Sequence, residues 1–227
     1  MTKVTIDANL LEKCPRVALA CVTADVLTRS TSPELEQELR VCEERILNLP
    51  EPKTVLESSA ILATRSAYKA LGKDPARYRG SAEALLRRVI AGKGLPRVNN
   101  VVDIINVVSV ESRLPIGLYD LQHVQGDILF RAGRAGETYK GIGKYDLNLE
   151  GLPVFCDALG PHGSPTSDSE RTMVTEATRQ VLGIIISFGG SSPGSSSGLH
   201  AAADRLATLL REHASAENAD VALVPAL

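Results

Sequence analysis

The stretch LPRVNNVVDIINVVSVESRLPIGLYD, residues 95–120, decides the fold of this chain. Between residues 100 and 109 a polar side chain recurs at every third position, and Val or Ile fills the gaps. The polar residues are Asn100, Asp103, Asn106 and Ser109. A helix gathers this spacing into one narrow stripe, whereas a strand would scatter it over both faces. The pattern therefore predicts a buried helix.

Two properties of this helix need a physical explanation. β-branched residues lose rotamer freedom in a helix and favour strands, so burial in the tertiary structure must override the local preference. A buried amide or carboxylate without a partner costs about 1 to 3 kcal/mol. Asn106 and Asp103 therefore either bond to neighbouring backbone or face a pocket, and the sequence leaves both alternatives open.

The composition is that of an ordinary globular protein. The chain has 227 residues and a net charge of -2, which suits one large or two small domains. Short apolar runs and an N-terminus without an apolar core predict no membrane span and no secretory signal, so we expect a cytoplasmic protein. No metal and no cofactor is predicted, because the cysteines form no CxxC pair or zinc-type cluster; they are Cys14, Cys21, Cys42 and Cys156.

The first half of the chain begins with predicted strands and continues with helices. Residues 3–7 and 16–27 have the apolar, β-branched character of strands. Ser32 supplies an N-cap and Pro33 the first helical residue of a helix that should end before Pro50.

Two further helices are predicted before the central stretch. One fits residues 54–71, with Gly72 just past its end. Ser81 is expected to cap the other, which Gly92 and Gly94 close.

After the central stretch the pattern changes to strands. We predict them at residues 127–131, 138–139, 153–157 and 181–187. The Gly/Ser-rich residues 188–198 resemble a flexible loop, and a helix from Leu199 and a short strand at 221–224 follow.

Helices mainly in the first half and strands mainly in the second predict an α+β fold. We expect one domain over residues 1–227, in which residues 1–76 pack on a core formed by 77–187 and residues 199–227 close the chain.

Two polar clusters could carry chemistry. Asp157, His162 and Ser164 together suggest a hydrolase triad, but the GxSxG motif of a nucleophile elbow is missing. Residues 167–172, SDSERT, form either a loop that caps itself or a ribose or phosphate contact. The segment 77–97 has six Arg or Lys residues against the single acid Glu83. It is either a solvated helix face or an RNA backbone contact.

Residues 77–187 resemble the B3/B4 module of the phenylalanyl-tRNA synthetase beta subunit, and more closely the free-standing B3/B4 proteins. The resemblance rests on the NNVVDxxN helix, Pro115, the pair Tyr119 and Asp120, Arg131 and the pair at 136–137. It continues through residues 153–157, 160–163 and 178–182. It implies a B3/B4-like fold with a mostly antiparallel sheet.

In the synthetase this module is an editing site that hydrolyses a wrongly attached aminoacyl ester. The substrate-binding residues implied by the resemblance are Asn100, Asp103, Asn106, Gly117, Tyr119, Gly160, His162 and Gly163. Expected phosphate contacts are Arg87, Arg88 and Arg97. Gly117 stands where the synthetase has a histidine, and its glutamate that reads a tyrosine hydroxyl would fall near Gly183 or Ile184.

Two functions follow from the resemblance as hypotheses. The first is a trans-editing deacylase for a mischarged aminoacyl-tRNA. The second is a binding module without catalysis, whose partner is a tRNA 3′ end or a free amino acid. No synthetase catalytic portion accompanies the module in these residues, so we expect no ligase activity from the chain alone.

Overall fold

The computed structural model describes residues 2–143, 145–189 and 195–225. Strand β2 (Ala18–Asp25) lies inside a four-stranded antiparallel sheet, called sheet B here, with the order β10-β2-β9-β3. Its other strands are β3 (Ile116–Asp120), β9 (Gln180–Ser187) and β10 (Glu217–Val224). An N-terminal strand therefore completes a sheet built mostly from the second half of the chain.

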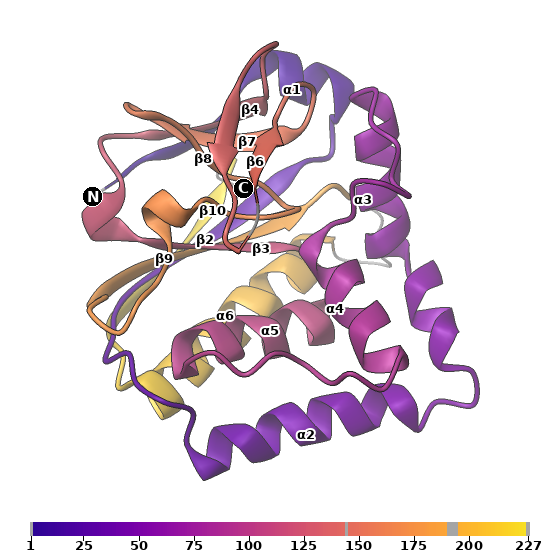
Figure 1. The fold of residues 1–227 in the computed structure, drawn as a ribbon, viewed down its shortest axis with the longest axis vertical. Coiled ribbons are helices and arrows are strands. Elements are labelled where there is room, and N and C mark those ends of the chain that lie inside the picture. The colour runs from indigo at the N-terminus through magenta and orange to yellow at the C-terminus, as the bar shows by residue number, and fades with distance from the viewer. Residues whose placement is uncertain (1, 144, 190–194, 226–227) are drawn as a thin grey trace.

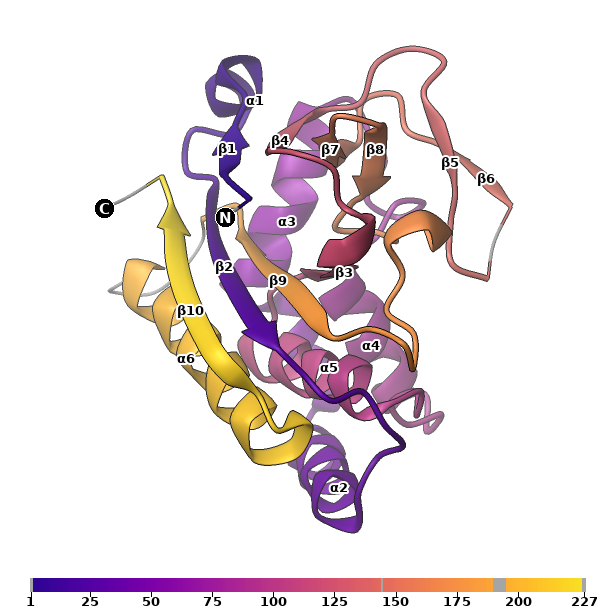
Figure 2. The ribbon, with the colours of Figure 1, turned by 90° about the vertical axis from the view of Figure 1, so that its left-hand side faces the viewer.

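A second four-stranded sheet, sheet A, lies above sheet B in Figure 1 and has the order β1-β4-β7-β8. Its strands are β1 (Val4–Ile6), β4 (Ile128–Ala132), β7 (Pro153–Asp157) and β8 (Gly160–Gly163). Strand β1 pairs parallel to β4, and the other pairs are antiparallel. The hairpin of β5 (Thr138–Lys140) and β6 (Asp146–Asn148) stands apart from both sheets (Figure 2).

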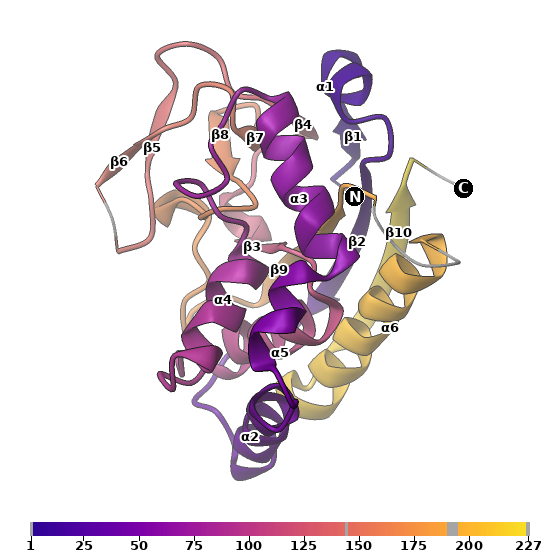
Figure 3. The same ribbon diagram turned by 90° about the vertical axis from the view of Figure 1, so that its right-hand side faces the viewer.

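Helices cover the face of sheet B that is turned away from sheet A. Helices α5 and α6 lie against this face, and α2 lies beyond them (Figure 1), while α3 and α4 follow one side of the molecule (Figure 3). The α-helices are α1 (Ala8–Lys13), α2 (Pro33–Leu47), α3 (Ser59–Ala70), α4 (Ser81–Ile90), α5 (Asn100–Ser112) and α6 (Ser195–Ala214). Three 3-10 turns in the described residues are η1 (Pro52–Glu57), η2 (Leu121–His123) and η3 (Glu170–Thr172). In the described part of the chain, no helix combines the length and apolarity that a membrane crossing requires.

Sheet B separates two apolar cores. Along β9, Leu182 and Ile184 join the core shared with Phe130 of sheet A. Their neighbours Val181 and Ile185 join the core formed with the helices. Because both faces are buried, β9 carries a continuous apolar run instead of the alternation of a half-exposed strand. Burial also explains the many β-branched residues of α5, because their packing in the core outweighs their weak preference for a helix.

The structure confirms the predicted α+β class. The central stretch forms α5, and Ser32 caps α2 by accepting a hydrogen bond from the Leu35 amide at 3.3 Å. The helix expected at residues 54–71 is divided into η1 and α3, because the backbone of Ser58 is extended between them.

Three local features of the structure differ from what the sequence predicted. The N-cap of α4 is Gly80 and not Ser81, whose hydroxyl instead accepts a hydrogen bond from the Ile116 amide at 3.3 Å. Helix α1 was not predicted, since it is one and a half turns long and buries only Leu10. The loop expected at 188–198 is shorter, because α6 already begins at Ser195; residues 190–194 lie outside the described residues.

A buried carboxylate joins α3 to α4. Glu83 accepts two hydrogen bonds from Arg65, at 2.8 and 2.9 Å, and one from Arg87 at 2.8 Å. Only 4% of Glu83 is exposed. These charge-assisted bonds hold the pKa of Glu83 below its usual value despite the opposing effect of burial.

Glu83→Gln should therefore reduce the free energy of unfolding by about 3 kcal/mol, because it removes the buried charge that pairs with Arg65, Arg79 and Arg87. Glu170→Gln is the control, since the pair of Glu170 with Lys140 is exposed, and it should change stability by less than about 0.5 kcal/mol. Urea unfolding measures both. Equal losses of unfolding free energy in the two variants would contradict a stabilising role of the Glu83 ion pairs.

Candidate functional site

Asn100, at the start of α5, has a structural role. Its side-chain carbonyl accepts a hydrogen bond from the Arg29 amide at 2.9 Å. Its Nδ2 donates to the carbonyls of Leu27 and His213, both at 2.9 Å. The side chain thereby joins α5 to the segment after β2 and to the end of α6. No donor of this side chain is left for a substrate.

Asp103 and Ser109 on the same stripe also bind the protein itself. Asp103 is fully buried and accepts hydrogen bonds from the Val98 amide at 3.0 Å and from the Thr31 hydroxyl. Burial raises the pKa of Asp103 above its usual value. The Ser109 hydroxyl donates to the Leu114 carbonyl at 2.8 Å. These contacts fix the backbone on either side of α5.

Asn106 differs from the rest of the stripe. The residue is 9% exposed, and its Nδ2 is buried without a hydrogen-bond partner among the described residues. An amide left in this state costs about 1 to 3 kcal/mol unless another group accepts its hydrogens. Of the two alternatives that the sequence left open, Asp103 bonds to nearby protein, and Asn106 retains a donor that a ligand oxygen could satisfy.

The Tyr119 ring occupies the space beside Gly117 and Gly163. Gly117 precedes Tyr119 by two positions on β3, and Gly163 ends the neighbouring β8. A Cβ atom at either glycine would overlap the Tyr119 hydroxyl. Tyrosine at 119 therefore requires glycine at both positions. Tyr119 is fully buried between the sheets.

Asp168 holds the Tyr119 hydroxyl from the loop that follows β8. The hydroxyl donates to Asp168 Oδ1 at 3.0 Å, and the amides of Leu118 and Ser164 also donate to this carboxylate, at 3.2 and 3.4 Å. Burial and the nearby Asp168 charge raise the pKa of Tyr119 well above its usual value, so the phenol stays protonated. Asp168 belongs to the polar run 167–172, and these contacts are with its own loop and with β3.

His162 is fully buried against Tyr119, with the two ring centroids 4.6 Å apart and the rings edge to face. Neither ring nitrogen has a partner among the described residues. Burial lowers the pKa of His162 to about 4, so the ring is neutral near pH 7. Asp157 pairs with Arg171 at 2.9 Å. Within the part of the chain that the structure describes, no hydrogen bond joins Asp157, His162 and Ser164 into a hydrolase triad.

The predicted substrate-binding residues thus divide between the two sides of sheet B. Asn106 belongs to α5, on the side of the helices. Gly117, Tyr119 and His162 lie on the side facing sheet A, with Gly160 at the start of β8, where its φ of 112° favours glycine. Among the described residues no group of three or more His, Cys, Asp or Glu could hold a metal ion.

The predicted RNA-contacting arginines differ in whether they form ion pairs within the protein. Arg97 lies 2.9 Å from Glu36 and 2.6 Å from Glu43, and Arg87 belongs to the α3–α4 carboxylate cluster. Arg88 is exposed and has no ion pair within the described residues. A phosphate would compete with carboxylates for the first two and meet an unpaired guanidinium at Arg88.

A family model, the B3/4 domain, matches residues 63–215. The chain belongs to the B3/4 domain family. The match includes α4, α5 and both sheets apart from β1, β2 and β10, so the resemblance predicted from the sequence is confirmed.

Relatives of this B3/4 domain include beta subunits of phenylalanine–tRNA ligase. The subunit of Paramagnetospirillum magneticum is 32% identical over 105 residues, which are 45% of this chain and 13% of that subunit. The subunit of Bartonella henselae is 28% identical over 146 residues, which are 60% of this chain and 18% of the subunit. The chain therefore spans less than a fifth of the length of these curated relatives.

A solved structure shares the fold. The N-terminal fragment of the phenylalanyl-tRNA synthetase beta subunit from Pyrococcus horikoshii matches with a TM-score of 0.51 and 16% identity. The match covers 95% of this chain and 50% of that fragment. The similarity therefore extends beyond residues 63–215, which the family model matches.

Asn100→Ala and Asn106→Ala should have very different effects on stability. Asn100→Ala removes the side-chain partner of three backbone groups and should cost about 3 kcal/mol, whereas Asn106→Ala should cost less than about 1 kcal/mol. Thermal and urea unfolding of the two variants measure the difference. An equal or larger loss for Asn106→Ala would assign Asn106 a structural role.

His162 should make stability depend on pH. The ring takes up a proton near its usual pKa of 6.5 when unfolded but only near pKa 4 when folded. The unfolded chain therefore binds more protons in this window, and stability falls as the pH drops from about 6.5 towards 4. His162→Leu should flatten this part of the melting-temperature profile, whereas His200→Leu, at an exposed position on α6, should leave it unchanged. Parallel profiles for wild type and His162→Leu would contradict the assignment.

Proposed function

We propose that this B3/4 domain binds the aminoacylated 3′ end of a tRNA and hydrolyses the ester of a wrongly attached amino acid. Asn106 carries the proposal, because its buried Nδ2 lacks a partner among the described residues and would be satisfied by a carbonyl oxygen. The related beta subunits belong to a ligase that acts on phenylalanine and tRNA. Their substrates suggest an aminoacyl-tRNA as the class of ligand.

The proposed reaction needs a positioned water and a polarised carbonyl. Water attacks the ester carbonyl carbon, the bond from that carbon to the ribose oxygen breaks, and the ribose oxygen takes up a proton. Asn106 would donate a hydrogen bond to the carbonyl oxygen as negative charge develops on it. Single donors of this kind contribute about a hundredfold or more in rate. The neighbouring ribose hydroxyl of the substrate is the expected relay for the proton.

The residues near β3 favour an amino acid other than tyrosine. Gly117 pairs with Ile184 across β3 and β9, and Ile184 is fully buried in the core between the sheets. A site that reads a hydroxyl must offer it a polar partner. Neither Gly117 nor Ile184 offers one, so this face of sheet B reads no hydroxyl, and we expect the residues around α5 to select the amino acid side chain by its size.

The expected RNA contact is the basic surface of α4 and the loop before α5. Arg88 is the first candidate because it is exposed and unpaired within the described residues. Arg87 and Arg97 would add positive potential while remaining paired with carboxylates. Phosphate contacts of this type should make binding weaker as the salt concentration rises.

A second candidate function is binding without hydrolysis, of a tRNA end or of a free amino acid. The arrangement around Tyr119 favours it: the hydroxyl fills the space beside Gly117, where the synthetase has a histidine. This chain therefore has no imidazole at that position, and the phenol that fills the space stays protonated. A retained ligand-binding site would then deliver or sequester its ligand for another protein.

The deacylase is tested with the purified chain and a panel of tRNAs carrying different mismatched amino acids. We expect release of at least one amino acid above the rate of spontaneous hydrolysis, and Asn106→Ala should lower kcat/KM about a hundredfold. Asn9→Ala, at an exposed position on α1, is the matched control and should keep full activity.

The same preparation separates the two candidates. Stabilisation by a non-hydrolysable aminoacyl-adenosine analogue or by a free amino acid, without release from any tRNA of the panel, would reject the deacylase and support the binding module. If the protein shows no turnover and no shift in melting temperature, both candidate functions are rejected.

A further inference from the structure

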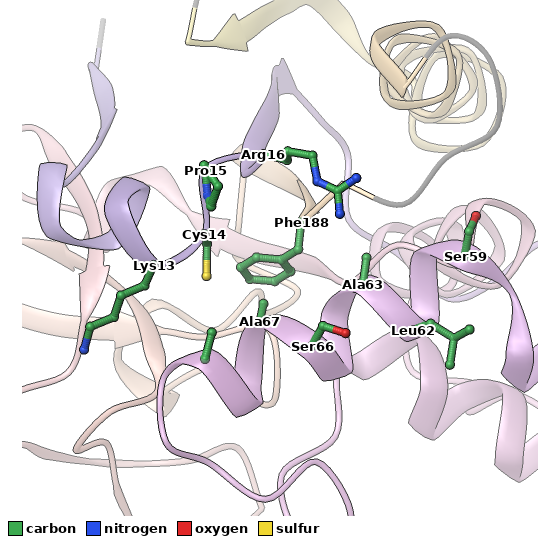
Figure 4. Close-up of a pocket in the computed structure, with 11 residues that line it drawn as sticks. Lys13, Cys14, Pro15, Arg16, Ser59, Leu62, Ala63, Ser66, Ala67 and Phe188 are labelled. Carbon is green, nitrogen blue, oxygen red and sulfur yellow. The ribbon is translucent and has the colours of Figure 1, made fainter.

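A ligand-sized groove is lined by residues of the N-terminal part of the chain and by Phe188, and Asn106 is not among its lining residues. It runs between α3 and the segment that joins α1 to β2, and the ring of Phe188, which directly follows β9, lies between the two (Figure 4). Its volume is about 480 Å³. Pockets that bind small molecules commonly have volumes of this order.

The groove combines an apolar floor with a basic rim. Ala63, Ala67 and Phe188 supply the floor, and the hydroxyls of Ser59 and Ser66 lie along α3. No Asp or Glu occurs among the described residues that line it. The lining can therefore donate hydrogen bonds and neutralise negative charge, but it offers no carboxylate to a cation.

Arg16 is the cation that the groove positions. Figure 4 shows its side chain extended above Phe188 and Ala63, whereas Lys13 points away. The backbone beside it accepts no side chain: a Cβ atom at Gly189 would lie 2.9 Å from Arg16 Cβ and 3.0 Å from its Nε. Gly189, with φ at 89°, thus leaves the space that Arg16 fills. Arg16 forms no ion pair with the described residues.

We propose that this groove binds a small molecule with an apolar body and one oxyanion, either a carboxylate or a phosphate monoester. The planar guanidinium of Arg16 would pair with the oxyanion through two hydrogen bonds, which is the geometry that arginine offers to both groups. The apolar body would cover Ala63, Ala67 and the edge of Phe188. A free amino acid fits less well, because its ammonium group would meet no acid.

A single tryptophan makes the test direct, since the natural chain contains none. Leu62 lines the groove and is 45% exposed, so Leu62→Trp places a fluorophore at its edge without disturbing a core. Leu159→Trp is the control reporter, because Leu159 is 64% exposed in the turn between β7 and β8, away from the groove. Matching melting temperatures would show that both variants are folded.

The probes are octanoate, octyl phosphate, octanamide and inorganic phosphate. We expect octanoate or octyl phosphate to change the Leu62→Trp fluorescence saturably, at least tenfold more tightly than uncharged octanamide or inorganic phosphate, and to leave Leu159→Trp unchanged. The tighter of the two anions identifies the head group. In the Leu62→Trp background Arg16→Gln should weaken the binding at least tenfold, whereas Arg88→Gln, also at an exposed arginine, should not.

Three results would overturn the proposal: no saturable signal from either anion, equal affinity for octanamide, or unchanged affinity in Arg16→Gln. Because Arg16 and Leu62 are separate from Asn106, the test is independent of the proposed deacylase. If the groove binds neither anion, the proposed deacylase activity is unaffected. If the chain shows no deacylase activity, the proposed binding in the groove is unaffected.

Discussion

Helix α5 is buried between sheet B and the other helices, and this burial obliges each polar side chain on it to find a partner. Asn100 meets the obligation with three backbone groups from two distant segments. Those bonds set the position of α5 against the end of β2 and the end of α6. The β-branched residues of the helix then fill the core on one side of sheet B, which explains why tertiary packing overrides their preference for strands.

The opposite face of sheet B depends on a steric relation among three residues. Tyr119 occupies the volume that side chains at Gly117 and Gly163 would need. Any side chain at 117 would therefore require the Tyr119 ring to move from its present position. Around this glycine, Asp168 accepts the hydrogen bond of the tyrosine hydroxyl and Ile184 contributes to the apolar surface.

Much of this fold could be predicted from local pattern. The three-residue polar spacing predicted α5, and the Ser32–Pro33 pair predicted the start of α2, because caps and periodicity are properties of neighbouring residues. The structural role of Asn100 could not be predicted, since its partners are Arg29, Leu27 and His213, more than 70 residues away along the chain. The spacing made Asn100 and Asn106 equivalent, and only the tertiary structure distinguishes them.

The same reasoning limits where chemistry can occur in this B3/4 domain. Between the sheets, the polar groups at Tyr119 and Asp168 already bond to each other and the neutral ring of His162 is enclosed by packing, so a substrate would have to displace a close-packed aromatic cluster to reach them. On the helix side, Asn106 holds a donor whose desolvation has no compensation within the described residues. A ligand oxygen that accepted a hydrogen bond from Asn106 would offset the free energy lost when this donor was desolvated on folding. If this domain binds an aminoacyl-tRNA as proposed, the residues around α5 would select the amino acid, and not the face that carries Gly117.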